Sequence, residues 1–348
     1  MEKRTDFVIG DVAVRPGSIA TLNLGLAGLY TSEPVAMQVH VAHGRRDGPV
    51  VFVSAAVHGD EINGVEIVRR LLHMPQLKRL AGTLLLVPIV NLFGFHIRSR
   101  YLPDRRDLNR SFPGNEGGSM ASRLANVFMQ QIVARSDIGI DLHTAAVHRD
   151  NLPQIRADIN DPMLAPLAKA FSAPVQLHSA APQGSLRGAA SDIGVSVMVY
   201  EAGEALRFDE VAIQVGLRGI VNALRQLAML PPVRRSRSRP SAELRSSTWV
   251  RAPQSGILRA QARLGDMVEK GAPLAVVADP AGQTEMIIEA PFDGVVIGRT
   301  NLPLVYEGEA VFHVGRTSQT SLLESHLDAL NDASSIAPPE LIEEPAIV

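Results

Sequence analysis

The sequence predicts a layered α/β fold, and three stretches of the chain carry this prediction. Residues 50–56 form an apolar, β-branched run with the length of a buried strand. Residues 62–72 follow after a five-residue turn at 57–61 and place apolar residues at the spacing of one helix face. A second apolar run of strand length covers residues 82–90. Strand, helix and strand in this order are typical of a layered α/β domain.

The remaining elements of this domain are predicted in chain order. Residues 7–45 alternate apolar and polar positions between Gly and Pro breaks, which indicates antiparallel strands at a sheet edge. We expect a helix over residues 120–134. Two further apolar strands are expected, one ending at His143 and one ending just before Glu201.

Composition excludes several functional classes. A chain of 348 residues that is 46% hydrophobic is long enough for two domains and a large core. Its net charge of -2 gives no overall field that would attract nucleic acid or an anionic membrane. The lack of cysteine excludes disulfides and thiolate metal sites. Without a signal-peptide core or an apolar stretch of about 18 residues, we expect a cytoplasmic protein.

Three polar residues follow predicted strands and form a candidate metal site. His58 and Glu61 lie where the first strand gives way to a helix, and His143 ends a later strand. In open α/β sheets, ligands bind at the carboxyl ends of the strands. A catalytic zinc typically takes three nitrogen or carboxylate ligands and keeps one position open. These three residues supply such a set.

The other histidines of the chain are interpreted differently. A single histidine at a strand end is usually partly buried and hydrogen-bonded, without a metal. We expect this of the remaining eight: His40, His43, His73, His96, His148, His178, His313 and His326.

The loop at residues 91–118 is rich in arginine. A guanidinium group matches a carboxylate, so arginines near a metal would form a pocket for an acidic group and for developing negative charge. A solvated basic loop is the alternative interpretation.

Three motifs together resemble one known family. His-Gly-Asp-Glu at 58–61, Asp-Leu-Asn-Arg at 107–110 and Asp-Leu-His at 141–143 are similar, in this order, to the succinylglutamate desuccinylase and aspartoacylase family. The resemblance covers roughly residues 8–230. It implies a mixed sheet with helices on both faces, like that of the zinc carboxypeptidases. It also implies one Zn²⁺ per chain and hydrolysis of the amide of an N-acyl amino acid.

The resemblance also implies roles for single residues. His58, Glu61 and His143 would bind zinc. Asp107 would orient a ligand histidine, since a hydrogen-bonded carboxylate fixes the tautomer of the ring and raises its basicity. Glu201 would be the catalytic glutamate.

Further residues are implied to contact substrate. Asn109 and Arg110 would clamp its carboxylate, and Arg100 would polarise the scissile carbonyl. An apparent short insertion after Arg100 leaves Arg98 as a rival. Arg187, in a glycine-flanked loop, could also touch substrate.

The chemistry of amide hydrolysis gives an independent reason for Glu201. Zinc lowers the pKa of its water toward 7, but a proton must still be removed and later delivered to the departing nitrogen. One carboxylate beside the open position can act as general base and then as acid. Glu201 is nearest the strand end, and Glu204 is the alternative.

The chain changes character after residue 230. Residues 231–247 are rich in Pro, Ser and Arg and predict an exposed linker. Residues 248–315 contain an internal repeat, since Ala-Pro-x-x-Gly at 252–256 recurs at 290–294. The repeat resembles the β-barrel-sandwich of biotinyl and lipoyl carriers. The hairpin at 279–283 lacks the carrier lysine, so we expect a structural module that narrows the active site.

The tail at 316–348 carries one possible amphipathic turn and is either a packed helix or disordered. The sequence therefore divides into a catalytic domain at 1–230, the linker, the repeat module and this tail. The leading interpretation is a zinc-dependent N-acyl amino acid deacylase that binds a small-molecule substrate and possibly forms a homo-oligomer. A zinc carboxypeptidase and a non-catalytic binding protein are the alternatives. The acyl group and the amino acid stay open.

Overall fold

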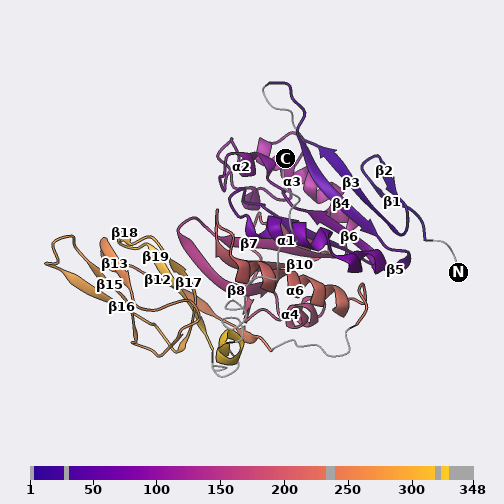
Figure 1. The fold of residues 1–348 in the computed structure, drawn as a ribbon. Coiled ribbons are helices and arrows are strands. Elements are labelled where there is room, and N and C mark those ends of the chain that lie inside the picture. Colours follow the sequence, from indigo (N-terminus) through magenta and orange to yellow (C-terminus); the bar gives the residue numbers. More distant parts are fainter. Residues whose placement is uncertain (1–3, 27–30, 233–239, 318–322, 329–348) are drawn as a thin grey trace, which may run out of the picture.

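A 13-stranded mixed sheet runs through the molecule (Figure 1). The computed structural model describes all residues except 1–3, 27–30, 233–239, 318–322 and 329–348. Ten strands follow one another across the sheet in the order β12-β19-β17-β8-β10-β7-β5-β6-β4-β3. Three more, β9, β11 and β14, pair beside this path.

Four parallel strands form the centre of the sheet, in the order β10-β7-β5-β6. Because they run in the same direction, their carboxyl ends meet at one edge, where ligands bind in open α/β sheets. Their bounds are β5 (Arg46–Ala55), β6 (Ala81–Val87), β7 (Ile138–Ala145) and β10 (Ser196–Glu204).

Alternating side chains of these strands enter two separate cores. In β5, Val51 and Val53 belong to one apolar cluster, whereas Phe52 belongs to the other. Strands of this kind are buried on both faces, which explains their continuous apolar sequences. The first core is covered by α1 (Asn63–Leu72), α4 (Leu164–Phe171) and α6 (Glu210–Gln226), and the second by α2 (Leu92–His96), α3 (Met120–Gln131) and α5 (Leu186–Asp192).

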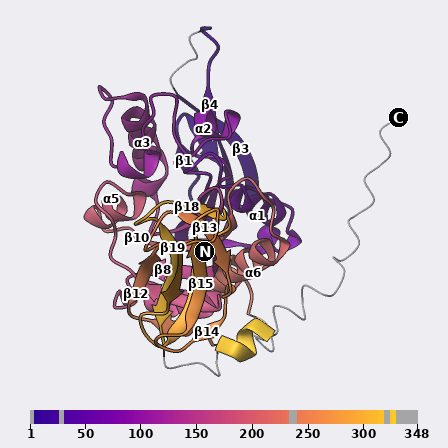
Figure 2. The same ribbon diagram turned by 90° about the vertical axis from the view of Figure 1, so that its left-hand side faces the viewer.

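Figure 2 shows α3 and α5 on one side of the sheet and α1 and α6 on the other. The described residues also form three short 3-10 helices, which are η1 (Pro75–Arg79), η2 (Leu108–Arg110) and η3 (Val133–Arg135). Among the helices that the structure describes, none has both the length and the apolar character needed to cross a membrane.

Antiparallel strands flank the parallel centre. At the amino-terminal edge, β3 (Ser18–Gly25) pairs with β4 (Ala36–His43), and β1 (Phe7–Ile9) pairs with β2 (Val12–Val14) in a small separate sheet. On the opposite side, β8 (Arg149–Ala157) lies between β10 and β17 and also pairs with β9 (Val175–His178). The strands and helices predicted for residues 7–204 are thereby confirmed, within a few residues at their ends.

Four of the described strands after residue 246 belong to the main sheet. β17 (Gly294–Thr300) pairs antiparallel with β8, and β12 (Ser247–Arg251), β14 (Met267–Val268) and β19 (Ala310–Arg316) continue from it. A second, four-stranded sheet of order β16-β15-β13-β18 lies at this end of the molecule. Its bounds are β13 (Gly256–Ala260), β15 (Pro273–Ala278), β16 (Glu285–Glu289) and β18 (Leu304–Val305).

The segment predicted as an exposed linker contributes to the core at one point. Ala242 and Leu244 are buried in β11 (Ala242–Leu244), which pairs parallel with β9. The prediction was wrong here because two alternating apolar residues suffice for a short inserted strand. Residues 233–239 lie outside the described part of the chain. In the tail, residues 323–328 are helical and Leu323 is buried beside Leu244, whereas Leu330 lies outside the described residues.

Leu244→Ala tests this packing of β11. Leu244 is fully buried, so its truncation leaves a cavity and should lower the free energy of unfolding by about 2–5 kcal/mol. Chemical denaturation measures the change. Glu243→Ala, at the exposed position between the two buried residues, is the matched control and should change stability by under about 1 kcal/mol. Equal effects of both substitutions would contradict a packed β11.

Candidate active site

His58, Glu61 and His143 meet at the carboxyl end of the central strands, and all three are buried. His58 and Glu61 lie in the turn between β5 and α1, and His143 lies near the end of the neighbouring strand β7. Their ligand atoms lie within 4.8 Å of one another. Within the described residues, no other three His, Asp or Glu side chains bring their ligand atoms this close.

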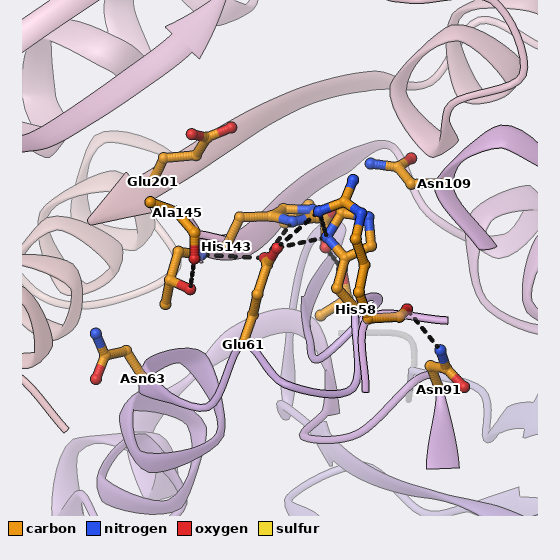
Figure 3. A network of polar contacts seen from close by, with 12 residues as sticks. His58, Glu61, Asn63, Asn91, Asn109, His143, Ala145 and Glu201 are labelled. Carbon is orange, nitrogen blue, oxygen red and sulfur yellow. Dashed lines mark hydrogen bonds and ion pairs between the residues drawn. The ribbon is translucent and has the colours of Figure 1, made fainter. Parts of the chain in front are cut away.

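The Glu61 carboxylate lies between the two imidazoles (Figure 3). Its Oε1 is 2.6 Å from His58 Nδ1, and its Oε2 is 2.7 Å from His143 Nδ1. The backbone N–H of Thr144 donates to Oε2 at 3.1 Å. Both histidines therefore present Nδ1 to the same point.

A carboxylate holds the far nitrogen of each ring. His58 Nε2 lies 3.2 Å from Asp107 Oδ1, and His143 Nε2 lies 2.7 Å from Asp141 Oδ2. Ser54 Oγ donates to the other oxygen of Asp141 at 2.7 Å. A hydrogen bond from Nε2 to a carboxylate would keep the proton on Nε2 and make the Nδ1 electron pair available to a metal, which is the state in which histidine acts as a ligand.

The charges of the cluster fit a divalent cation. Three carboxylates, those of Glu61, Asp107 and Asp141, surround the imidazoles, and Arg100 supplies one guanidinium at 2.9 Å from Asp107 and 3.3 Å from Glu61. If both imidazoles are neutral, the three carboxylates and the one guanidinium leave two net negative charges on the cluster. A buried charge that is not balanced costs several kcal/mol, so the donor set suits a doubly charged ion.

Each pKa shift in the cluster favours the charged form of its group. Burial opposes charge on every member, yet Glu61 raises the pKa of His58, and Asp141 and Glu61 raise that of His143 well above its usual value. Burial likewise opposes ionisation of Glu61, but the two imidazoles hold its pKa below the usual range. The site thus favours positive charge between its carboxylates.

A close backbone contact brings the arginine-rich loop to the cluster. Any side chain at Gly59 would overlap the backbone of Gly94 in the middle of α2, so only glycine permits this approach. The loop then places Arg100 against Glu61 and Asp107. Arg98, the rival of Arg100, is exposed and does not line the cavity.

A cavity of about 280 Å³ opens onto the cluster. It is lined by five arginines, by Glu201 and by Trp249 from β12, together with small and polar residues. The complete lining is His58, Glu61, Arg100, Asn109, Arg110, Asp141, His143, Thr144, Ala145, Ala146, Arg149, Asn151, Arg156, Ser179, Pro182, Ser185, Arg187, Val199, Glu201 and Trp249.

Glu201 faces this cavity because β10 pairs with β7, which places Glu201 directly beside His143 in register. Its Oε2 accepts a hydrogen bond from Asn151 Nδ2 at 2.8 Å and lies 3.0 Å from Arg156 Nη2. In Figure 3, Glu201 and Asn109 lie on either side of the Glu61 carboxylate. Both are thus placed to contact a molecule that reaches the cluster.

Three predicted substrate contacts lie on the other wall. Asn109 Oδ1 accepts the backbone N–H of Leu186 at 2.9 Å, which ties η2 to α5. Arg110 is exposed and lines the cavity. Arg187 is 9% exposed, and its Nη2 donates to Ser179 Oγ at 3.0 Å and to Ala180 O at 2.6 Å. Its Nη1 is buried without a hydrogen-bond partner in the structure.

The structure adds site residues that the sequence analysis missed. Asp141 had a signal, because side chains two residues apart on a strand share a face and Asp141 precedes His143 by two. Asn151 and Arg156 on β8 and Trp249 on β12 had none, since their local sequences do not differ from those of other strands.

A family model of the succinylglutamate desuccinylase/aspartoacylase catalytic domain matches residues 47–227. The match covers more than half of the chain and includes every residue of the buried cluster. The chain therefore belongs to this family.

Particular relatives agree with this assignment. The chain is 26% identical over 280 residues to the N-alpha-acetyl-L-2,4-diaminobutyric acid deacetylase of Halomonas elongata, covering 77% of this chain and 82% of the relative. Two solved structures share the fold. The product-bound ectoine utilization protein EutE (DoeB) of Ruegeria pomeroyi has a TM-score of 0.80 at 23% identity, covering 90% of this chain and 99% of that one. A succinylglutamate desuccinylase/aspartoacylase of Rhodobacter sphaeroides has a TM-score of 0.77 at 22% identity, covering 85% and 96%.

Asp141→Asn tests whether the cluster is a metal site. The amide can no longer accept the Nε2–H as a charged partner, so divalent metal affinity should fall roughly 10- to 100-fold. Competition with a chelator of known affinity measures the loss. Asp192→Asn, on the exposed end of α5, removes the same charge away from the cluster and should leave affinity unchanged. Unaltered metal binding in Asp141→Asn would contradict this role.

Proposed function

We propose that this protein is a zinc-dependent hydrolase that cleaves the amide of a small N-acyl amino acid bearing a carboxylate. One observation carries the proposal: the buried His58–Glu61–His143 cluster opens into a cavity lined by arginines and Glu201. The 26% identity of the chain to an N-alpha-acetyl-L-2,4-diaminobutyric acid deacetylase supports the same class of reaction.

His58, Glu61 and His143 would hold the zinc. Two imidazole nitrogens and a carboxylate are a usual ligand set for catalytic zinc. When bound, the ion supplies Lewis acidity toward the scissile carbonyl and toward water. Asp107 and Asp141 would keep both histidines in the tautomer that presents Nδ1 to the ion.

Glu201 would act as general base toward water and then as acid toward the departing nitrogen. Its Oε2 is held by Asn151 and Arg156, whereas no side chain of the described residues donates a hydrogen bond to its Oε1. A carboxylate fixed through one oxygen can exchange a proton through the other. Arg100 would stabilise the negative charge that develops on the carbonyl oxygen, because its guanidinium lies at the rim of the cluster.

Asn109, Arg110 and Arg187 would bind the substrate carboxylate. Burial lowers the pKa of Arg187 and the nearby Arg156 acts in the same direction, whereas Glu201 and Asp158 offset part of this effect. A buried donor without a partner costs free energy unless a ligand satisfies it. A substrate carboxylate at Nη1 would do so.

The strands after residue 246 would form a structural β-barrel-sandwich module, separate in function from the catalytic domain. Their contribution to the site is Trp249, which closes one side of the cavity. A cavity of about 280 Å³ suits a small substrate better than a peptide and thereby favours a deacylase over a carboxypeptidase.

Metal analysis combined with an amine-release screen tests the function. We expect about one zinc per chain, and release of free amine from N-acyl amino acids but not from peptides. A chelator should abolish the activity and added zinc should restore it. A metal-free protein without amine release would instead favour a binding protein.

Glu201→Gln tests the proton-transfer role. The amide keeps the shape of the side chain but cannot take a proton, so kcat should fall roughly 10²- to 10⁴-fold while zinc content stays unchanged. Steady-state kinetics and metal analysis of the same preparation provide both readouts. Retention of most of the activity would remove Glu201 from the mechanism.

Arg110→Ala tests the carboxylate clamp. Loss of a charged hydrogen bond to the substrate should raise KM roughly 10- to 100-fold and change kcat much less. Arg106→Ala, which removes the same charge from an exposed position in the same loop, is the control. If both variants raise KM by the same factor, the effect comes from the long-range charge of the loop and not from a direct clamp by Arg110.

A further inference from the structure

Glu204 lies three residues after Glu201 on β10 but does not line the cavity. Its side chain is 14% exposed, and both oxygens are engaged. Oε1 accepts the backbone N–H of His148 at 2.9 Å, and Oε2 accepts from Asn301 Nδ2 at 3.1 Å. The sequence left Glu204 as an alternative catalytic acid, but these contacts direct it away from the substrate.

The two partners of Glu204 belong to different parts of the fold. His148 lies in the turn between β7 and β8, and Asn301 directly follows β17. The backbone N–H of Asn301 also donates to His148 O at 2.7 Å, and Thr300 Oγ1 donates to the same oxygen at 3.3 Å. Glu204 thus joins three segments at one point.

The residue after His148 is part of the cavity. Arg149 lies in register with Thr300, and its guanidinium carbon is 5.5 Å from the centre of the Trp249 ring. Trp249 also stacks on His313, with ring centres 4.4 Å apart and planes inclined by 12°. Burial lowers the pKa of His313 to about 3, so its ring is neutral at ordinary pH. Arg149 and Trp249 are here called the outer wall of the cavity.

We propose that Glu204 is a positioning residue that fixes the outer wall by tying the His148 turn to Asn301. The part of this proposal that concerns substrate rests on the proposed function. Through His148, Glu204 sets the start of β8 and hence the position of Arg149. Through Asn301, it fixes the position of β17. β17 pairs with β19, and β19 pairs with β12, which carries Trp249.

The direction of the hydrogen bond from Asn301 to Glu204 permits an exchange of donor and acceptor that conserves the net charge. Asn301 Oδ1 accepts from Arg299 Nε at 3.3 Å, so its Nδ2 faces Glu204. In Asn301→Asp, two carboxylates face each other and repel. In the double variant Glu204→Gln/Asn301→Asp, the new amide can donate to the new carboxylate, Arg299 keeps its acceptor, and the net charge equals that of the original pair.

Tryptophan fluorescence reports on the environment of the outer wall without any substrate, because Trp249 is the single tryptophan of the chain. We expect Asn301→Asp to shift the emission maximum and to increase quenching by acrylamide. The double variant should return both toward the original values. Arg207→Ala removes a cation 3.7 Å from Glu204 without touching either hydrogen bond and should change neither readout.

Kinetics with the best substrate of the amine-release screen give the second readout. Asn301→Asp should raise KM roughly fivefold or more, the order expected when one hydrogen bond is lost, with kcat nearly unchanged. The double variant should recover most of this loss. Asn301→Ala, which removes the donor without adding charge, should change both readouts in the same direction by less.

Two results would overturn the proposal. One is an Asn301→Asp protein whose fluorescence, quenching and KM match the original. The other is a double variant that stays as impaired as Asn301→Asp, or whose kcat collapses, since Glu204 would then act on the substrate itself. The fluorescence measurements need no turnover, so they remain decisive even if no N-acyl amino acid is hydrolysed.

Discussion

The buried carboxylate of Glu61 is the interaction on which the rest of the site depends. An isolated buried charge would cost far more than the fold can supply, so it must be matched from several directions. His58, His143, Thr144 and Arg100 supply those contacts, from three separate segments. The requirement to satisfy one carboxylate therefore brings together the β5–α1 turn, the end of β7 and the arginine-rich loop.

Charge is divided within the cavity. The inner end holds three carboxylates around two imidazoles, whereas the walls carry arginines, one of which, Arg156, lies 3.0 Å from Glu201. Such a cavity attracts a cation to its inner end and an anion to its walls. This division would let the proposed metal site and the proposed binding of an acidic substrate lie within the same cavity.

The carboxy-terminal strands take part in this arrangement through the sheet itself. β17 continues the main sheet beside β8, and a Cβ at Gly298 would lie 2.8 Å from Asn151 Oδ1, so glycine there leaves room for the side chain that holds Glu201. Trp249 reaches the cavity from the same group of strands. The module expected to lie beside the active site therefore contributes to its wall by direct pairing.

The central strands, the helices between them and the residues at the strand ends could be predicted from local sequence, because apolar periodicity and strand termini are local properties of the chain. The sequence also identified His58, Glu61 and His143, since each follows a recognisable strand. Only the tertiary structure placed Asn151 on Glu201 and Asn301 on Glu204, residues 50 and 97 positions apart. It also decided that β11 is buried and that Trp249 lines the cavity. Such contacts depend on which strands pair and in which register, and the free energy that selects one register comes from the whole sheet and not from any single segment.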